Sequence, residues 1–146
     1  MTEPTTDHVT LHLASVLPSV EAVEQTAESF AQKAGFDEDD IGHIALVCRE
    51  AAVNAVVHGN KYDPGKEVTA DFDLTDDALS VRIGDQGSGF NPNEIPDPLA
   101  EENLLRTHGR GVFLMRAIMD EVHFRQLTPG TEITLKKHRT TREADK

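Results

Sequence analysis

The sequence of 146 residues is poor in cysteine, in positive charge and in long apolar runs. Its one cysteine, Cys48, excludes an internal disulfide framework and a zinc site built from cysteines. It has 14 Lys and Arg against 26 Asp and Glu, a net charge of −12 at pH 7. This balance argues against direct binding to nucleic acid or to a membrane surface, which needs a basic face. The longest apolar run, residues 44–48, is too short to span a membrane.

The remaining composition predicts one folded domain in the cytoplasm. Hydrophobic residues make up 38% of the chain, too many for wholesale disorder. A chain of this length can bury roughly two-thirds of its unfolded surface. The first residues lack the basic and apolar segments of a secretory signal. We expect a flexible N-terminus over residues 1–7, a domain over residues 8–138 and a flexible charged tail over residues 139–146.

The spacing of apolar residues predicts an α+β fold. Period-two alternation predicts a strand from His8, a hairpin, and two final strands, whereas helical spacing predicts three helices. The expected strands cover residues 8–13, 66–74, 78–84, 121–127 and 132–137, and the expected helices cover residues 18–34, 38–57 and 112–119. Between the hairpin and the third helix lies a proline-rich, acidic stretch with the length of a lid. This order favours two layers, a largely antiparallel sheet of about five strands with the three helices on one face.

A first candidate site lies on the second expected helix. Glu50, Asn54 and His58 are four residues apart and form a polar row on a segment otherwise built from Ala and Val. An asparagine oxygen suits Mg²⁺ that keeps water and phosphate oxygens as its other ligands. A glutamate one turn away can accept a proton from a nucleophile. The pattern is short, and a surface glutamate beside a capping asparagine would look the same.

A second candidate site follows the expected strand that ends at residue 84. Asp85 can accept a hydrogen bond from an exocyclic amine such as that of adenine, and Gly87 and Gly89 let the backbone approach a flat ring. An ordinary glycine-rich turn is the alternative. Neither a nucleophile elbow nor a dinucleotide fingerprint fits, because Gln86, Phe90 and Pro92 stand where those motifs need glycine.

A third candidate site opens the last expected helix. Glycines there expose backbone N–H groups at the electropositive helix end, which makes a phosphate cradle, and Arg110 can add a charged contact. The alternative is a hinge before a core helix. No P-loop motif occurs anywhere in the chain. The residues proposed to face a nucleotide here are His108, Gly109, Arg110, Gly111 and Val112.

Taken in this order, the three segments resemble the GHKL ATPase superfamily. Residues 50–59 match its asparagine-bearing box, residues 85–90 its first glycine box, and residues 109–112 its second. Within the superfamily the chain most resembles the anti-sigma-factor serine-protein kinases, a likeness carried by residues 109–115, 119–122 and 130–135 as well. The resemblance covers roughly residues 8–138.

The resemblance implies a Bergerat-type α/β sandwich that binds ATP and Mg²⁺. It implies that Asn54 holds Mg²⁺ and that Glu50 is the base acting on the acceptor hydroxyl. Asp85 would bind the adenine amine, with Gly87 and Gly89 behind the ring. The glycine-opened helix end would face the phosphates, under a lid formed by about residues 91–108.

The resemblance also implies protein partners. The acceptor would be a Ser or Thr of an anti-anti-sigma (STAS) protein, a sigma factor would be sequestered, and the chain would form a homodimer. A non-catalytic, ATP-dependent binding module of the same fold stays open, although the presence of Glu50 favours catalysis. A detached histidine-kinase domain is disfavoured, because about seven residues before the first strand leave no room for a phosphoacceptor helix.

Overall fold

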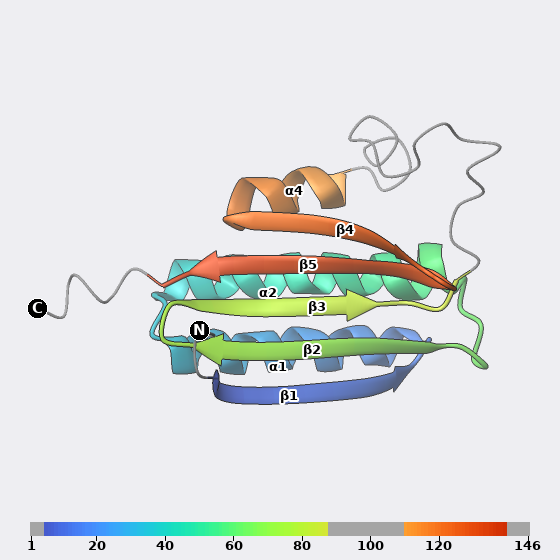
Figure 1. The fold of residues 1–146 in the computed structure, drawn as a ribbon, viewed down its shortest axis with the longest axis horizontal. Helices are drawn as coiled ribbons and strands as arrows, with labels where there is room; N and C mark the ends of the chain where they lie inside the picture. Colours follow the sequence, from blue (N-terminus) through green and yellow to red (C-terminus); the bar gives the residue numbers. More distant parts are fainter. Residues whose placement is uncertain (1–4, 88–109, 140–146) are drawn as a thin grey trace, which may run out of the picture.

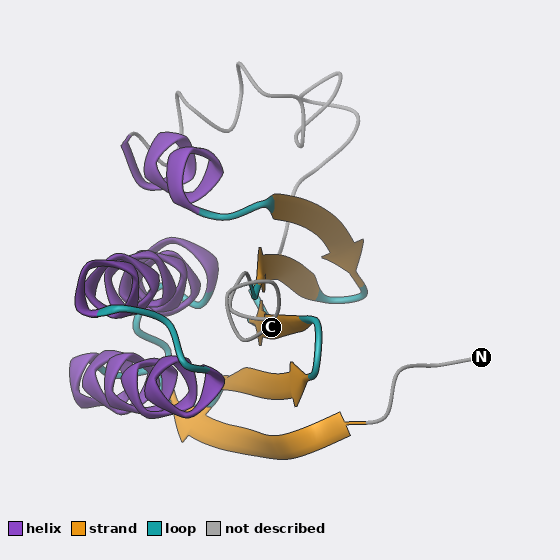
Figure 2. Ribbon diagram, turned by 90° about the vertical axis from the view of Figure 1, so that its left-hand side faces the viewer, coloured by secondary structure: helices purple, strands orange, loops and turns teal. Residues whose placement is uncertain are grey.

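Five strands form one sheet, and the helices lie on a single face of it (Figure 1; Figure 2). The computed structural model describes residues 5–87 and 110–139. Every neighbouring pair of strands is antiparallel, in the order β1-β2-β3-β5-β4. The strands are β1 (Thr5–Ala14), β2 (Glu67–Thr75), β3 (Ala78–Gly84), β4 (Glu121–Leu127) and β5 (Gly130–His138). This arrangement confirms the predicted fold class.

The helix layer consists of α1, α2 and α4, with α2 in the middle (Figure 1; Figure 2). Their bounds are α1 (Leu17–Ala34), α2 (Glu38–Val53) and α4 (Arg110–Ile118), and α2 continues directly into the π-helix η1 (Asn54–Gly59). None of the helices within the described ranges is long and apolar enough to span a membrane.

Local chemistry explains where α1 ends and α2 begins. Gly35 stops α1 in the left-handed conformation, with φ 88°, and its N–H donates to the carbonyls of the last turn. The Asp37 side chain caps α2 by accepting a hydrogen bond from the Asp40 N–H at 2.8 Å. Acidic residues fill the first turn of α2, where the helix dipole favours negative charge. The predicted stop and start are both confirmed.

Two predicted boundaries differ by a few residues from those of the structure. β1 begins at Thr5 rather than His8, and Thr5 pairs with Thr75 of β2. Arg139, just beyond the predicted end of the domain, donates its Nε to the Ala34 carbonyl at 3.0 Å and its guanidinium to the Thr75 carbonyl at 2.7 Å. Apolar alternation missed both, because these contacts come from backbone pairing and from carbonyls at element ends rather than from burial.

The core lies between the helices and the inner face of the sheet. Along β2 buried and partly buried residues alternate, so one face meets the helices and the other carries polar side chains. The Phe72 ring of β2 is fully buried and stacks on Phe30 of α1, with centroids 5.5 Å apart. Cys48 is also fully buried, and burial raises the pKa of its thiol to about 12. It is a core residue rather than a reactive thiol.

Truncating Phe72 tests the packing of the two layers. Phe72→Ala should lower the free energy of unfolding by about 3–5 kcal/mol, because it leaves a cavity that α1 cannot fill. Urea denaturation measures the change. Leu17→Ala is the control, since Leu17 is 55% exposed and a surface truncation should cost less than about 0.5 kcal/mol. Equal losses for the two variants would contradict this view of the core.

Candidate functional site

The end of α2 does not continue as a regular α-helix. In η1 the Asn60 N–H donates to the Ala55 carbonyl at 2.8 Å, a spacing of five residues instead of four. Such π-turns are rare in proteins, and many of those that occur lie at functional sites. The predicted polar row therefore breaks after its second member: Asn54 is buried, whereas His58 is exposed. The wider turn also brings Gly59, five residues after Asn54, back to nearly the same side of the helix.

Glu50 and Asn54 meet the N-terminal end of α4. A Cβ placed on Gly111 would lie 3.3 Å from Glu50 Oε1 and 3.7 Å from Asn54 Nδ2, so glycine permits this close approach. Asn54 is only 7% exposed, and its Nδ2 has no hydrogen-bond partner among the described residues. A buried N–H donor without a partner costs free energy, so this nitrogen suits an acceptor atom of a ligand, whereas a metal ion would take the Oδ1 oxygen of the same amide.

Asp85 is buried at the end of β3. Its Oδ1 accepts hydrogen bonds from the backbone N–H of Gly87 at 3.0 Å and of Thr131 at 3.2 Å. Burial raises the pKa of this carboxyl, and the two N–H groups oppose that rise. Both bonds go to the same oxygen, whereas Oδ2 lies against Gly59.

Three glycines make room around Asp85. A Cβ on Gly59 would lie 2.2 Å from Asp85 Oδ2, and one on Gly87 would lie 2.0 Å from the Gly59 carbonyl oxygen. Gly130 has φ +111°, and a Cβ there would lie 1.9 Å from the Asp85 carbonyl oxygen. The end of η1, the end of β3 and the start of β5 therefore converge on one carboxylate.

A second polar network fixes the turn that follows Asp85. The Asn60 side chain is 1% exposed; its Oδ1 accepts from the Gln86 N–H at 2.8 Å and its Nδ2 donates to the Glu67 carbonyl at 3.1 Å. The Glu67 N–H in turn donates to Gln86 Oε1 at 2.7 Å. This network ties η1, β2 and the turn together and holds Gly87 in place.

Sequence reasoning did not assign the residues that hold Asp85 in position. The sequence places Gly59 in the asparagine-bearing box and Gly130 in a segment that resembles the family, but it gives neither residue, nor Asn60, a role beside Asp85. The sequence holds only a weak signal for these roles. Gly59 and Asn60 directly follow an apolar helix, and Gly130 opens the last strand. Gly130 and Thr131 lie far from Asp85 in the sequence, and only the β3–β5 pairing brings them together.

The remaining predicted residues are only partly placed. Arg110 is the first residue of α4. The Val112 side chain is fully buried, so only its backbone can face a ligand. Gly89, His108, Gly109 and the expected lid over residues 91–108 lie outside the described residues.

The Asn54 side chain fits Mg²⁺ through its amide oxygen, a hard and uncharged ligand. The Glu50 carboxylate also lies beside Gly111. Within residues 5–87 and 110–139 no group of three or more His, Cys, Asp or Glu is placed to hold a metal ion.

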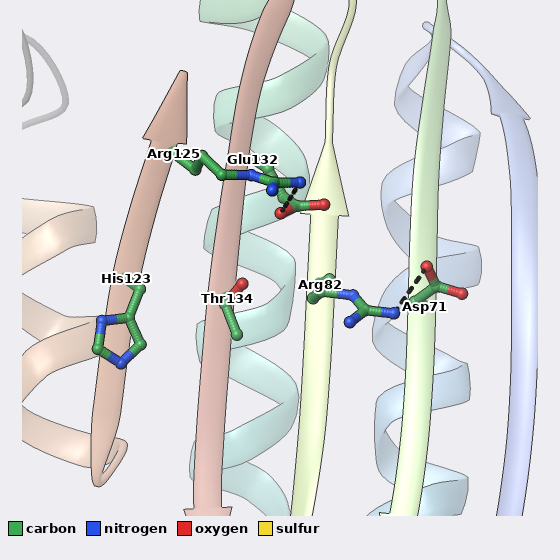
Figure 3. Close-up of a pocket in the computed structure, with 6 residues that line it drawn as sticks. All are labelled: Asp71, Arg82, His123, Arg125, Glu132 and Thr134. Carbon is green, nitrogen blue, oxygen red and sulfur yellow. Dashed lines mark hydrogen bonds and ion pairs between the residues drawn. The ribbon is translucent and has the colours of Figure 1, made fainter. Parts of the chain in front are cut away.

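A separate hollow lies on the outer face of the sheet (Figure 3). It has a volume of about 530 Å³. Arg82 pairs with Asp71 at 3.4 Å and Arg125 pairs with Glu132 at 3.1 Å, as the dashed lines in Figure 3 mark. Because each guanidinium already faces a carboxylate, this hollow offers no net positive charge to a phosphate. The nucleotide site is expected on the other side of the sheet, where Asp85, Asn54 and Gly111 gather.

Comparison with known proteins decides the family. A model of the histidine kinase-like ATPase domain matches residues 13–137. The serine-protein kinase RsbW of Bacillus licheniformis is 31% identical over 121 residues, which cover 79% of this chain and 75% of that protein. The chain belongs to the histidine kinase-like ATPase family, in the group of the RsbW serine-protein kinases. The superfamily and the subfamily inferred from the sequence are both confirmed.

Other relatives agree. The serine-protein kinase RsbW of Listeria innocua is 30% identical and covers 80% of this chain and 78% of its own length. That of Bacillus subtilis is 27% identical over 144 residues, 90% of this chain and 86% of its own. A crystal structure of the RsbU and RsbW domains of a Mycobacterium tuberculosis protein matches with a TM-score of 0.64 at 19% identity. The match covers 90% of this chain and 32% of that longer one, and it supports the fold.

Replacing Asp85 tests whether the buried carboxylate is kept at a cost in stability. Because its pKa in the folded chain is raised, the folded state binds the proton more tightly, and stability falls as pH rises from the ordinary value near 3.8 through the raised pKa. Asp85→Asn should therefore raise Tm at pH 7, with a smaller gain at pH 4, while ATP affinity falls at least tenfold. Thermal unfolding at the two pH values, with nucleotide titration, measures this.

The control for this experiment is Asp76→Asn, an exposed carboxyl in the turn between β2 and β3. It should leave both the Tm at pH 7 and the affinity for ATP unchanged. A lower Tm for Asp85→Asn at pH 7 would show that the carboxylate stabilises the fold and would contradict the prediction.

Proposed function

We propose that this chain is a protein-serine/threonine kinase that transfers the γ-phosphoryl group of ATP to a hydroxyl of a partner protein. One observation carries the proposal: the Glu50 carboxylate and the buried side chain of Asn54, whose Nδ2 has no partner among the described residues, lie beside Gly111 at the start of α4. The proposed base and the proposed metal ligand would thus lie together at a helix N-terminus, where phosphate groups bind well. The names of the RsbW relatives support the same reaction.

The nucleotide would lie between Asp85 and the start of α4. Asp85 would accept a hydrogen bond from the adenine amine through Oδ2, because Oδ1 is already engaged by Gly87 and Thr131. Gly87 and Gly89 would leave room for the flat ring. The phosphates would meet His108, Gly109, Arg110 and Gly111 and the backbone of Val112.

Asn54 would hold Mg²⁺ beside the phosphates. Mg²⁺ neutralises the charge that develops on the phosphoryl oxygens during transfer. The oxygen of the amide is an uncharged ligand, which leaves the coordination shell open to phosphate. Gly111 keeps side-chain atoms away from this position.

Glu50 would act as the base. As the acceptor hydroxyl oxygen bonds to the γ-phosphorus, Glu50 accepts the hydroxyl proton, and the bond from the γ-phosphorus to the β,γ-bridging oxygen breaks to release ADP. The products are ADP and a phosphoserine or phosphothreonine. Glu50 is only partly buried, so a protein hydroxyl can reach it from solvent.

The proposed acceptor is an anti-anti-sigma (STAS) protein, and the proposed second partner is a sigma factor that the chain sequesters. In this proposal the chain acts as a homodimer in the cytoplasm. The names of the curated relatives support the kinase part of this proposal. The net charge of −12 favours a protein partner with basic patches over DNA. The chain would then act on transcription through another protein.

Glu50→Gln separates catalysis from binding. The variant should bind ATP with unchanged affinity, because glutamine keeps the size of the side chain, while phosphoryl transfer falls by about 10²–10⁴-fold. Transfer from labelled ATP to a purified STAS protein of the same genome measures this. Glu28→Gln, on the exposed face of α1, is the control and should be fully active.

Transfer by Glu50→Gln at the wild-type rate would show that the base is misassigned. If the wild-type chain itself forms a tight complex with the STAS protein but transfers no phosphate, the chain is a binding module and not a kinase.

Asn54→Ala tests the metal site. It should reduce the affinity for ATP at least tenfold when Mg²⁺ is present, and much less when EDTA is present, because only the metal-dependent part is lost. Isothermal titration with and without EDTA measures the two affinities. If the variant keeps the Mg²⁺ dependence of the wild type, Asn54 is not a ligand.

A further inference from the structure

An apolar hollow lies beside Glu50, between α2 and α4. It has a volume of about 350 Å³ and is lined by Leu46 and Glu50 of α2 and by Phe113 and Leu114 of α4. Phe113 is 68% exposed and Leu46 is 39% exposed. Leu114 is partly buried and packs against the core. Glu50 is the only charged residue among the described ones that line it.

The hollow lies on the side of Glu50 that faces away from the metal position. Leu46, Glu50 and Asn54 follow each other at intervals of four residues, so they lie on one face of α2, about 6 Å apart along its axis. Asn54 and Gly111 mark the nucleotide side of Glu50. Leu46 marks the opposite side, one turn nearer the start of α2.

Leu46 and Phe113 are two exposed apolar side chains that line the same hollow. Within the described residues the exposed large hydrophobic side chains are Val16, Leu17, Leu46, Tyr62 and Phe113. Leu46 and Phe113 are the two that line the hollow, and they come from different helices. Single exposed apolar residues need no explanation, whereas a shared apolar hollow beside a polar group is typical of a binding surface.

We propose that this hollow receives an apolar side chain of the phosphoacceptor protein, next to its acceptor serine or threonine. The inference rests on the proposed function, because it takes Glu50 as the base. The acceptor hydroxyl must come within about 2.6–3.2 Å of the Glu50 carboxylate. With ATP on the Asn54 side, the acceptor protein has to approach over Leu46 and Phe113, and its neighbouring side chain enters the hollow. Phe113 and Leu46 then determine which protein is phosphorylated.

Phe113→Ala and Leu46→Ser test the docking surface. In both variants KM for a purified STAS protein of the same genome should rise at least tenfold, with kcat changed by less than threefold, because truncation of a central aromatic anchor weakens binding rather than chemistry. The Kd of the STAS protein, measured by titration with ADP present, should rise by the same factor. Phe113→Leu keeps an apolar side chain and should restore most of the affinity.

Leu17→Ala is the matched control, since Leu17 is as exposed as these residues but lies on α1, on the far side of α2 from α4 (Figure 2). Its KM and Kd should equal those of the wild type. Circular dichroism and the Kd for ATP show whether each variant is folded and binds nucleotide. An unchanged Kd for the STAS protein in Phe113→Ala, or an equal loss of ATP affinity, would overturn the inference.

The Kd measurements separate a failure of this inference from a failure of the proposed function. If the wild-type chain transfers no phosphate, the proposed kinase activity fails, and the Kd values still show whether the hollow binds the STAS protein. If the wild type transfers phosphate but the Phe113 and Leu46 variants match it in KM and Kd, the docking surface alone is wrong.

Discussion

The close packing of three backbone segments around the Asp85 carboxylate is the constraint on which the site depends. Asp85 directly follows β3, its Oδ1 accepts a hydrogen bond from the Thr131 N–H of β5, and Gly59 is the last residue of η1. A side chain at Gly59, Gly87 or Gly130 would collide with this arrangement, because each Cβ would lie within about 2.2 Å of another atom. The carboxylate is thereby held in a position where burial disfavours its charged form. The packing of the surrounding sheet has to offset this loss of stability. Buried ionisable groups that lower the stability of the folded chain are typical of functional sites.

The π-turn links this carboxylate to the second half of the site. In a regular α-helix a residue five positions after Asn54 would lie well away from the face that carries Glu50 and Asn54. The wider turn of η1 brings Gly59 toward Asp85 while Asn54 still faces Gly111. One continuous helix therefore contributes both to the expected adenine end and to the expected phosphate end. The Asn60 network, anchored on β2 and Gln86, keeps that turn from relaxing into a regular helix.

The sequence predicts those features of the structure that depend on residues close together in the chain, and it misses those that depend on residues far apart in it. Alternation predicted the exact bounds of β3 and β4, and the expected end of the first helix at residue 34 and start of the second at residue 38 match α1 and α2, because burial and capping are local properties. The sequence also placed Glu50 and Asn54 on one helix face. It missed the π-turn, which no periodicity signals, and it missed the contact of Gly130 and Thr131 with Asp85, which exists only through strand pairing. Arg139 was missed for the same reason, since its acceptors belong to α1 and β2.

The same face of α2 orders the proposed reaction along its axis. Leu46, Glu50 and Asn54 stand one turn apart, so the proposed acceptor protein, the proposed base and the proposed metal ion would each correspond to one residue in succession. Because α2 packs between α1 and α4 (Figure 2), these three positions cannot shift independently of one another. Phosphoryl transfer depends on positioning more than on covalent chemistry, and a buried helix supplies positions more rigid than a loop can. The acidic surface of the chain is no obstacle to this reaction, since the phosphates would be met by Mg²⁺ and by backbone N–H groups rather than by surface charge.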